Sequence, residues 1–136
     1  KVNKKKYKNH NNLNFFKKSV SKLRSFKFKK NSIILICGLV HHVSDKDIIP
    51  FINLIRLKKY KVFAIDPLKK INQNLFNRIL VKYDKGKFIR NEKEYKIIFK
   101  DFDKIEYNNF LRFKFDHIMH LYNLDVSFFK KILFKN

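Results

Sequence analysis

The sequence lacks a second cysteine and lacks a long apolar run, and each absence excludes a class of protein. Its single cysteine, Cys37, cannot form an internal disulfide, which excludes a secreted disulfide scaffold. The longest uninterrupted apolar stretch runs from residue 33 to residue 40, whereas a membrane-spanning helix needs about 20 apolar residues. We therefore expect no transmembrane segment.

Acidic residues are scarce and are absent from the first 44 positions. That stretch holds 12 of the 33 Lys and Arg residues and none of the 11 Asp and Glu residues, in a chain of formal net charge +22. The abundance of Lys, Asn, Ile and Phe indicates an AT-rich coding genome, but codon bias does not explain the shortage of acids. We expect a polyanion as the partner of this protein, and RNA is the polyanion that we favour.

The apolar content is sufficient for one folded domain. Of the 136 residues, 45% are hydrophobic and 16% are aromatic, which is not the composition of a disordered tail. The charge pattern divides the chain into a basic N-terminal arm over residues 1–31, a domain over residues 32–124 and a terminal helix over residues 125–136. The domain carries an insertion at about residues 67–92.

Hydrophobic periodicity predicts the elements of this domain. The order strand, helix, strand, insertion, strand, helix, strand is that of an α+β, ferredoxin-like split βαβ sandwich. We expect the strands at residues 32–38, 60–65, 94–99 and 117–122. We expect helices between residues 13 and 23 and over residues 68–80, and two further helices that begin after the caps Ser44 and Asp125. Another helix should begin after Asp101 or Asp103. Its inward residues would be Ile105, Phe110, Leu111 and Phe113.

Two segments resemble the RNA-recognition motif. Ile34-Leu-Ile-Cys-Gly-Leu39 followed by Val43-Ser-Asp-Lys-Asp-Ile48 is similar to the first signature strand of that family and the acidic helix start after it. Tyr95-Lys-Ile-Ile-Phe99 is similar to the second signature strand, and the resemblance covers about residues 32–124. It implies a sheet that stacks bases on aromatic side chains, here on Tyr95. Leu35 stands where the family has its first aromatic residue.

Basic residues in the arm and around the second expected strand are the predicted RNA contacts, because lysine and arginine neutralise phosphates. The predicted RNA-binding residues are Lys4, Lys5, Lys6, Lys8, Lys17, Lys18, Lys22, Arg24, Lys27, Lys29, Lys30, Lys58, Lys59, Lys61 and Tyr95.

Other chemistry has weaker support in the sequence. Asp66 follows Gly38 by 28 residues in a strand, helix, strand layout that outlines a dinucleotide site, but the glycine-rich turn is absent, so we expect Asp66 to be a turn residue. Cys37 is expected to be a buried, inert thiol. We predict no metal site and no cofactor, since Cys-x-x-Cys is absent and His117 and His120 would point to opposite faces of a strand. His41 and His42 are expected to be loop or core histidines with ordinary hydrogen-bond partners.

We therefore expect a non-enzymatic, structural RNA-binding protein, most plausibly an rRNA-contacting subunit of a mitochondrial or other organellar ribosome that also touches neighbouring protein subunits. The acid-free, lysine-rich N-terminus fits an organelle-targeted protein. Two alternatives stay open. One is an accessory subunit of an organellar membrane complex that binds anionic lipid or an acidic partner, and the other is a small Rossmann-like α/β enzyme.

Overall fold

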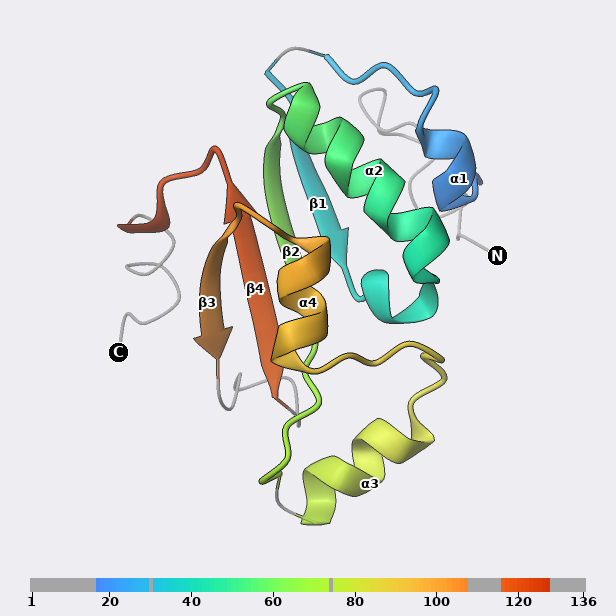
Figure 1. Ribbon diagram of the computed structural model, residues 1–136, viewed down its shortest axis with the longest axis vertical. Helices are drawn as coiled ribbons and strands as arrows, with labels where there is room; N and C mark the ends of the chain where they lie inside the picture. The colour runs from blue at the N-terminus through green and yellow to red at the C-terminus, as the bar shows by residue number, and fades with distance from the viewer. Residues whose placement is uncertain (1–16, 30, 74, 108–115, 128–136) are drawn as a thin grey trace, which may run out of the picture.

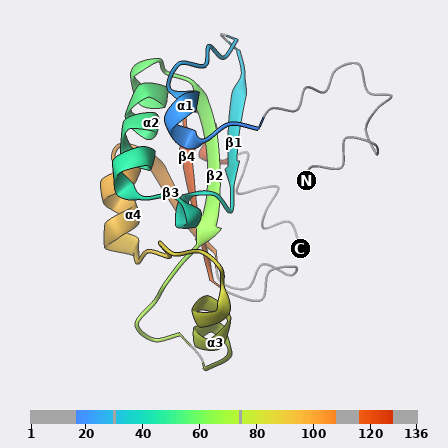
Figure 2. The same cartoon turned by 90° about the vertical axis from the view of Figure 1, so that its right-hand side faces the viewer.

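A computed structural model describes residues 17–29, 31–73, 75–107 and 116–127. It shows an α+β domain with a four-stranded mixed sheet in the order β1-β2-β4-β3, as the α+β class predicts. Helices α2 and α4 cover one face of the sheet, α1 packs on α2, and α3 lies below the sheet (Figures 1 and 2). The elements are α1 (Val20–Leu23), β1 (Ile33–Cys37), η1 (Val40–His42), α2 (Asp45–Leu57), β2 (Lys61–Pro67), α3 (Leu75–Tyr83), α4 (Glu92–Ile98), β3 (Asp103–Tyr107) and β4 (His117–Tyr122).

Strands β1 and β2 are parallel neighbours joined by α2. Ile34 and Ile36 of β1 are buried with Phe51 and Ile55 of α2, which forms the centre of the core. A continuous apolar run such as that of β1 is typical of a central strand, but β1 pairs only with β2 within the described residues and lies at an edge of the sheet. Ile33 and Leu35 face away from α2 and are exposed.

The expected third strand at residues 94–99 is wrong, because this segment is the helix α4. A capping box fixes its start: Asn91 accepts a hydrogen bond from the Glu94 backbone N–H, and the Glu94 carboxylate accepts one from the Asn91 N–H. Tyr95, Ile98 and Phe99 then recur at helical spacing and are buried. The capping box and the 3.6-residue spacing of the buried side chains therefore specify a helix in this segment, and not the expected strand.

The helix expected after Asp101 or Asp103 is also wrong where the structure describes it. Asp101 adopts a left-handed backbone conformation, φ 68°, and Asp103 begins the strand β3, which contains Ile105. Phe110, Leu111 and Phe113 lie outside the described residues. The expected strand at residues 117–122 is confirmed as β4, which lies antiparallel between β2 and β3.

Other predicted boundaries are shifted. The helix expected over residues 68–80 is α3, which begins at Leu75. The arm contains α1, whose Val20 is buried in the core against α2. Asp125 accepts a hydrogen bond from the backbone N–H of Ser127, as expected of a cap, and residues 128–136 of the expected terminal helix lie outside the described residues. Within the described part of the chain, every helix is too short or too polar to cross a bilayer.

Arg90 anchors the segment that returns from α3 to the body. Its guanidinium donates to the carbonyl oxygens of Val40 (2.7 Å), Val43 (2.7 Å) and Phe88 (2.9 Å) and to Asp45 Oδ1 (2.6 and 3.0 Å). The side chain is buried, so these acceptors depend on it rather than on water. One residue thus fixes the loop after α3 to η1 and to the start of α2.

Replacing Arg90 by Ala should lower the free energy of unfolding by at least about 2 kcal/mol, because buried carbonyl groups lose their donor. Urea denaturation measures this change. Arg78→Ala, at an exposed position on α3, is the matched control and should change stability by less than about 0.5 kcal/mol. Equal stability of the two variants would contradict the anchoring role.

His120 is a neutral histidine of the core. Its ring stacks on Phe99 with centroids 4.2 Å apart, between β4 and α4. Burial, and secondarily the charge of Lys104, lowers the pKa of His120 to about 3. His117 lies on the opposite face of β4, as the spacing predicted. The native state therefore excludes a proton that the unfolded chain takes up below pH 6.5.

Stability should fall as the pH decreases from about 6.5 towards 3, because the unfolded state binds the extra proton in that window. Between pH 7 and pH 4.5, His120 should account for about 2 to 3 kcal/mol of lost unfolding free energy. His120→Phe keeps the ring stacking but cannot bind a proton. Urea denaturation at the two pH values should therefore show a loss of unfolding free energy that is smaller by this amount. His42→Phe, at an exposed position, is the control. An unchanged pH dependence in His120→Phe would show that His120 is not the group responsible.

Candidate functional site

The carboxyl ends of β1 and β2 meet at one edge of the sheet, and the chain turns sharply there. Gly38 follows β1 with φ 57°, and its N–H donates to the carbonyl oxygen of Ile65 (2.9 Å). This left-handed conformation favours glycine. The turn leads into η1, which carries His41 back over the end of β2.

His41 and Asp66 form a buried pair at this edge. Asp66 Oδ1 accepts hydrogen bonds from the His41 backbone N–H (3.1 Å) and from the ring Nδ1 (2.8 Å). The residues are only 5% and 2% exposed, so the pair is shielded from water. Asp66 is therefore an internal residue of β2 and not the turn residue that the sequence suggested. Its Oδ2 is buried and has no hydrogen-bond partner in the described residues.

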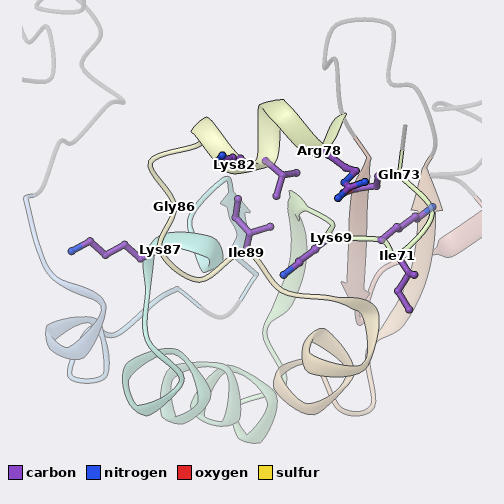
Figure 3. A pocket seen from close by; sticks show the side chains of 10 residues that line it. Lys69, Ile71, Gln73, Arg78, Lys82, Gly86, Lys87 and Ile89 are labelled. Atoms are coloured by element: carbon purple, nitrogen blue, oxygen red, sulfur yellow. The ribbon is translucent and has the colours of Figure 1, made fainter. Parts of the chain in front are cut away.

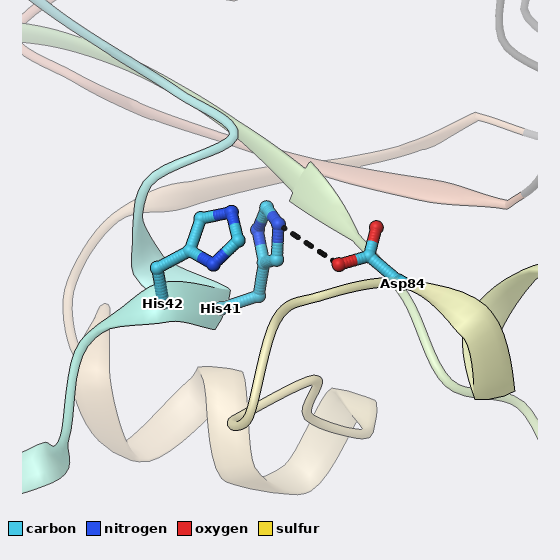
Figure 4. Close-up of side chains that lie close together, drawn as sticks. All are labelled: His41, His42 and Asp84. Atoms are coloured by element: carbon cyan, nitrogen blue, oxygen red, sulfur yellow. Dashed lines mark ion pairs between the residues drawn. The ribbon is translucent and has the colours of Figure 1, made fainter.

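Asp84 approaches His41 from the other side. His41 Nε2 lies 3.5 Å from Asp84 Oδ1, and the ring of His42 lies beside that of His41 at 4.0 Å (Figure 4). Asp84 also accepts from the Gly86 N–H, and a Cβ at position 86 would lie 2.1 Å from His41 Cδ2. The loop after α3 therefore passes closely over the imidazole, which only glycine permits at residue 86.

The donor atoms of His41, His42 and Asp84 lie within 4.8 Å of one another, a spacing that a metal ion could bridge. The contact of His41 Nε2 with Asp84 and the packing of the His42 ring on that of His41 already account for this proximity without an ion. His117 and His120 are not in the group. The expectation that the protein holds no metal stays a prediction.

A cavity of about 270 Å³ opens beside the His41–Asp66 pair. Cys37 is exposed at its rim, which corrects the expectation of a buried thiol. Burial of its surroundings and the charge of Asp66 raise the pKa of this thiol, so the reactive thiolate is disfavoured. The cavity is lined by Cys37, Gly38, His41, Ile65, Pro67, Asp84 and His117.

A second, basic hollow of about 570 Å³ lies between the segment after β2, α3 and the loop that follows α3 (Figure 3). Five cationic side chains and no carboxylate belong to its lining. The cations are Lys69, Lys70, Arg78, Lys82 and Lys87.

The predicted RNA contacts are mostly exposed where the structure describes them. Lys27 and Lys29 come close to Lys58, Lys59 and Lys61, because the Tyr60 hydroxyl donates to the Phe28 carbonyl (3.2 Å) and the two rings are in contact. This basic group lies at the amino ends of β1 and β2, away from the His41–Asp66 pair. Lys17, Lys18, Lys22 and Arg24 are exposed on and around α1, and Lys4, Lys5, Lys6, Lys8 and Lys30 lie outside the described residues.

Tyr95 cannot stack on a base, and its place in the predicted site is wrong. The side chain is fully buried under the sheet, on a helix, and its hydroxyl donates to the carbonyl oxygen of Pro67 (2.9 Å). Burial raises the pKa of this hydroxyl. Tyr95 therefore belongs to the core.

The missed part of the site is the contact between residues far apart in the chain. His41 and Asp66 are 25 positions apart, and Asp84 is a further 18 along. The strand, helix, strand layout with Gly38 and Asp66 indicated the strand ends where this site lies. The absence of a glycine-rich turn argued against a site there. No family model matches the sequence, and no curated protein matches it. The geometry of the site is therefore the basis for a functional assignment.

Proposed function

We propose that this chain is an α+β ligand-binding domain that uses its single Rossmann-like βαβ unit to hold a small molecule at the carboxyl ends of β1 and β2, with His41 as its proton-transferring group. The observation that carries the proposal is the buried His41–Asp66 pair beside a cavity. This function corresponds to the third possibility that the sequence left open. It rests on three features of the site.

The first feature is the position of the cavity. In open sheets built from parallel βαβ units, ligands bind outside the carboxyl ends of the strands. The β1-α2-β2 unit is parallel, and the cavity lies at that end. Its volume suits a group of several heavy atoms rather than a macromolecule.

The second feature is the orientation of His41. A carboxylate that accepts from Nδ1 fixes the ring and directs Nε2 towards Asp84 Oδ1, 3.5 Å away, so a proton transferred by His41 would pass between Nε2 and Asp84, which also lines the cavity. The raised pKa of Cys37 makes the neighbouring thiol a poor nucleophile at neutral pH. Among the polar groups of the cavity, His41 is thus the one best suited to move a proton.

The third feature is the unsatisfied oxygen of Asp66. A buried carboxylate oxygen without a donor costs free energy, and Asp66 is not among the residues that line the cavity, so a ligand would sense this charge through His41 rather than by direct contact. The side chain of His41 fills the turn in which a dinucleotide site would hold its pyrophosphate. The ligand therefore differs in binding mode from a dinucleotide in a glycine-rich turn.

Nucleotide-containing cofactors are suitable first probes, because mononucleotide-binding halves are built from such βαβ units. In NMR titrations of the full chain with ATP, NAD, coenzyme A and S-adenosylmethionine, at least one probe should shift the imidazole signals of His41 and His117. The signals of His120, which lies on the other face of the sheet, should not move.

Asp66→Asn should weaken binding of that probe about tenfold, the effect of losing one charge-assisted hydrogen bond of about 1.4 kcal/mol. Asp101→Asn is the matched control, since Asp101 is exposed and pairs with Arg56 far from the cavity. The proposal fails if no probe moves the two histidine signals, or if Asp66→Asn binds as well as the parent chain.

A second candidate function, RNA association, is favoured by the charge distribution. We propose in this case a non-enzymatic structural subunit of a mitochondrial or other organellar ribosome that contacts rRNA with its lysines. The described basic residues of the arm are exposed, and those at the amino ends of β1 and β2 lie beside them. Recognition-motif base stacking forms no part of this proposal, because Tyr95 is buried.

RNA affinity should then fall steeply with salt, and the slope measures the phosphates contacted. Five lysine-to-glutamine changes in the arm should reduce the slope of log affinity against log salt by about 3.5 to 4.5 in filter binding to a folded RNA. They leave the buried Val20 of α1 in place. The changed residues are Lys4, Lys5, Lys6, Lys17 and Lys18, and the control changes are Lys46, Lys85, Lys93, Lys96 and Lys100. Equal slopes for the two variants would exclude a special role of the arm.

A further inference from the structure

Helix α3 turns its apolar side to solvent. Leu75, Phe76, Ile79 and Tyr83 fall within about 100° of the helix circumference, and all four are exposed, Leu75 by 71% and Tyr83 by 77%. Asn77, on the opposite side of the helix, is buried. An amphipathic helix on the surface of a soluble domain normally shows the reverse orientation. Ile71, which precedes the helix, is 99% exposed and adds to this apolar surface.

Cationic side chains surround the apolar surface. Arg78 and Lys82 lie on α3, and Lys69, Lys70 and Lys87 line the same hollow from the segments before and after it (Figure 3). The only acidic residue between positions 68 and 90 is Asp84, which is paired with His41. This part of the surface therefore combines exposed apolar groups with unbalanced positive charge.

We propose that α3 and its flanking segments form a contact surface for an anionic lipid bilayer. The apolar residues of α3 would enter the boundary between headgroups and acyl chains, and the lysines and Arg78 would bind lipid phosphates. Charge complementarity selects this occupant. A second copy of the chain would bring the same cations against each other, which costs free energy.

RNA is a weaker match for the same surface. Phosphates would satisfy the cations, but contact with RNA leaves aliphatic side chains such as Leu75 and Ile79 exposed to water or against polar groups. Burial of these side chains in a bilayer contributes about 25 cal/mol per Å² of apolar surface removed from water. The surface is separate from the small cavity at His41, so this proposal is independent of the ligand proposal.

The absence of tryptophan from the chain provides a direct probe. Phe76→Trp places a single indole on the apolar surface, and its fluorescence should shift to shorter wavelength with vesicles that contain phosphatidylglycerol or cardiolipin. Vesicles of phosphatidylcholine alone should give a shift several-fold smaller at equal lipid concentration. Leu57→Trp, at an exposed apolar position at the end of α2, is the matched control and should remain water-exposed with both lipids.

Cosedimentation of the full chain with the anionic vesicles should be reduced at least tenfold by Leu75→Glu combined with Ile79→Glu. Leu57→Glu should leave it unchanged. Both changes lie at exposed positions and test binding without removing core contacts. Undiminished sedimentation of the double variant overturns the proposal. So does an indole shift that a folded RNA produces as strongly as the vesicles, or one that appears with protein concentration in the absence of lipid.

Discussion

Parallel pairing of β1 with β2 is the constraint on which the rest of the domain depends. Because α2 crosses over one face of the sheet to connect the two strands, their carboxyl ends lie side by side. Gly38, η1 and the end of β2 then bring His41 against Asp66. The same crossover buries Ile48, Phe51, Ile52 and Ile55 of α2 against β1 and β2, so one packing event builds both the core and the candidate site.

The segment between β2 and α4 gives this edge its chemical character. Leu68 and Arg90, at the two ends of the segment, form a parallel β-bridge. The backbone N–H of Lys69 donates to the carbonyl oxygen of Arg90 (3.0 Å). The bonds of Arg90 to η1 fix one end of the segment, and Asp84 and Gly86 cover the imidazole of His41. The segment thereby closes one side of the small cavity and presents α3, with its apolar surface, to the outside.

Positive charge lies at both ends of the parallel strand pair, and acid–base chemistry lies at one. Lys27, Lys29 and the lysines of the α2-β2 turn lie at the amino ends of β1 and β2, whereas Lys18 and Lys87 lie near η1, at the same end as His41 and Asp66. The net charge therefore bears on association with polyanions or membranes, and the buried pair bears on a small ligand. The two kinds of function do not compete for the same residues.

Composition and local pattern alone determined the α+β class, the strong basic bias, the strands near residues 33–37, 61–67 and 117–122, and the cap at Asp125. These features depend on neighbours within a few positions. Residues 92–98 carry a local helix signal in the capping box of Asn91 and Glu94, and tertiary structure decided only that Tyr95, Ile98 and Phe99 pack under the sheet. Tertiary structure also decided the roles of Asp66, whose partner His41 is 25 positions away, and of Arg90, whose partners in η1 and α2 are at least 45 positions away. A strand, a cap or a charge is encoded locally, but a buried pair exists only where the folded chain brings its two members together.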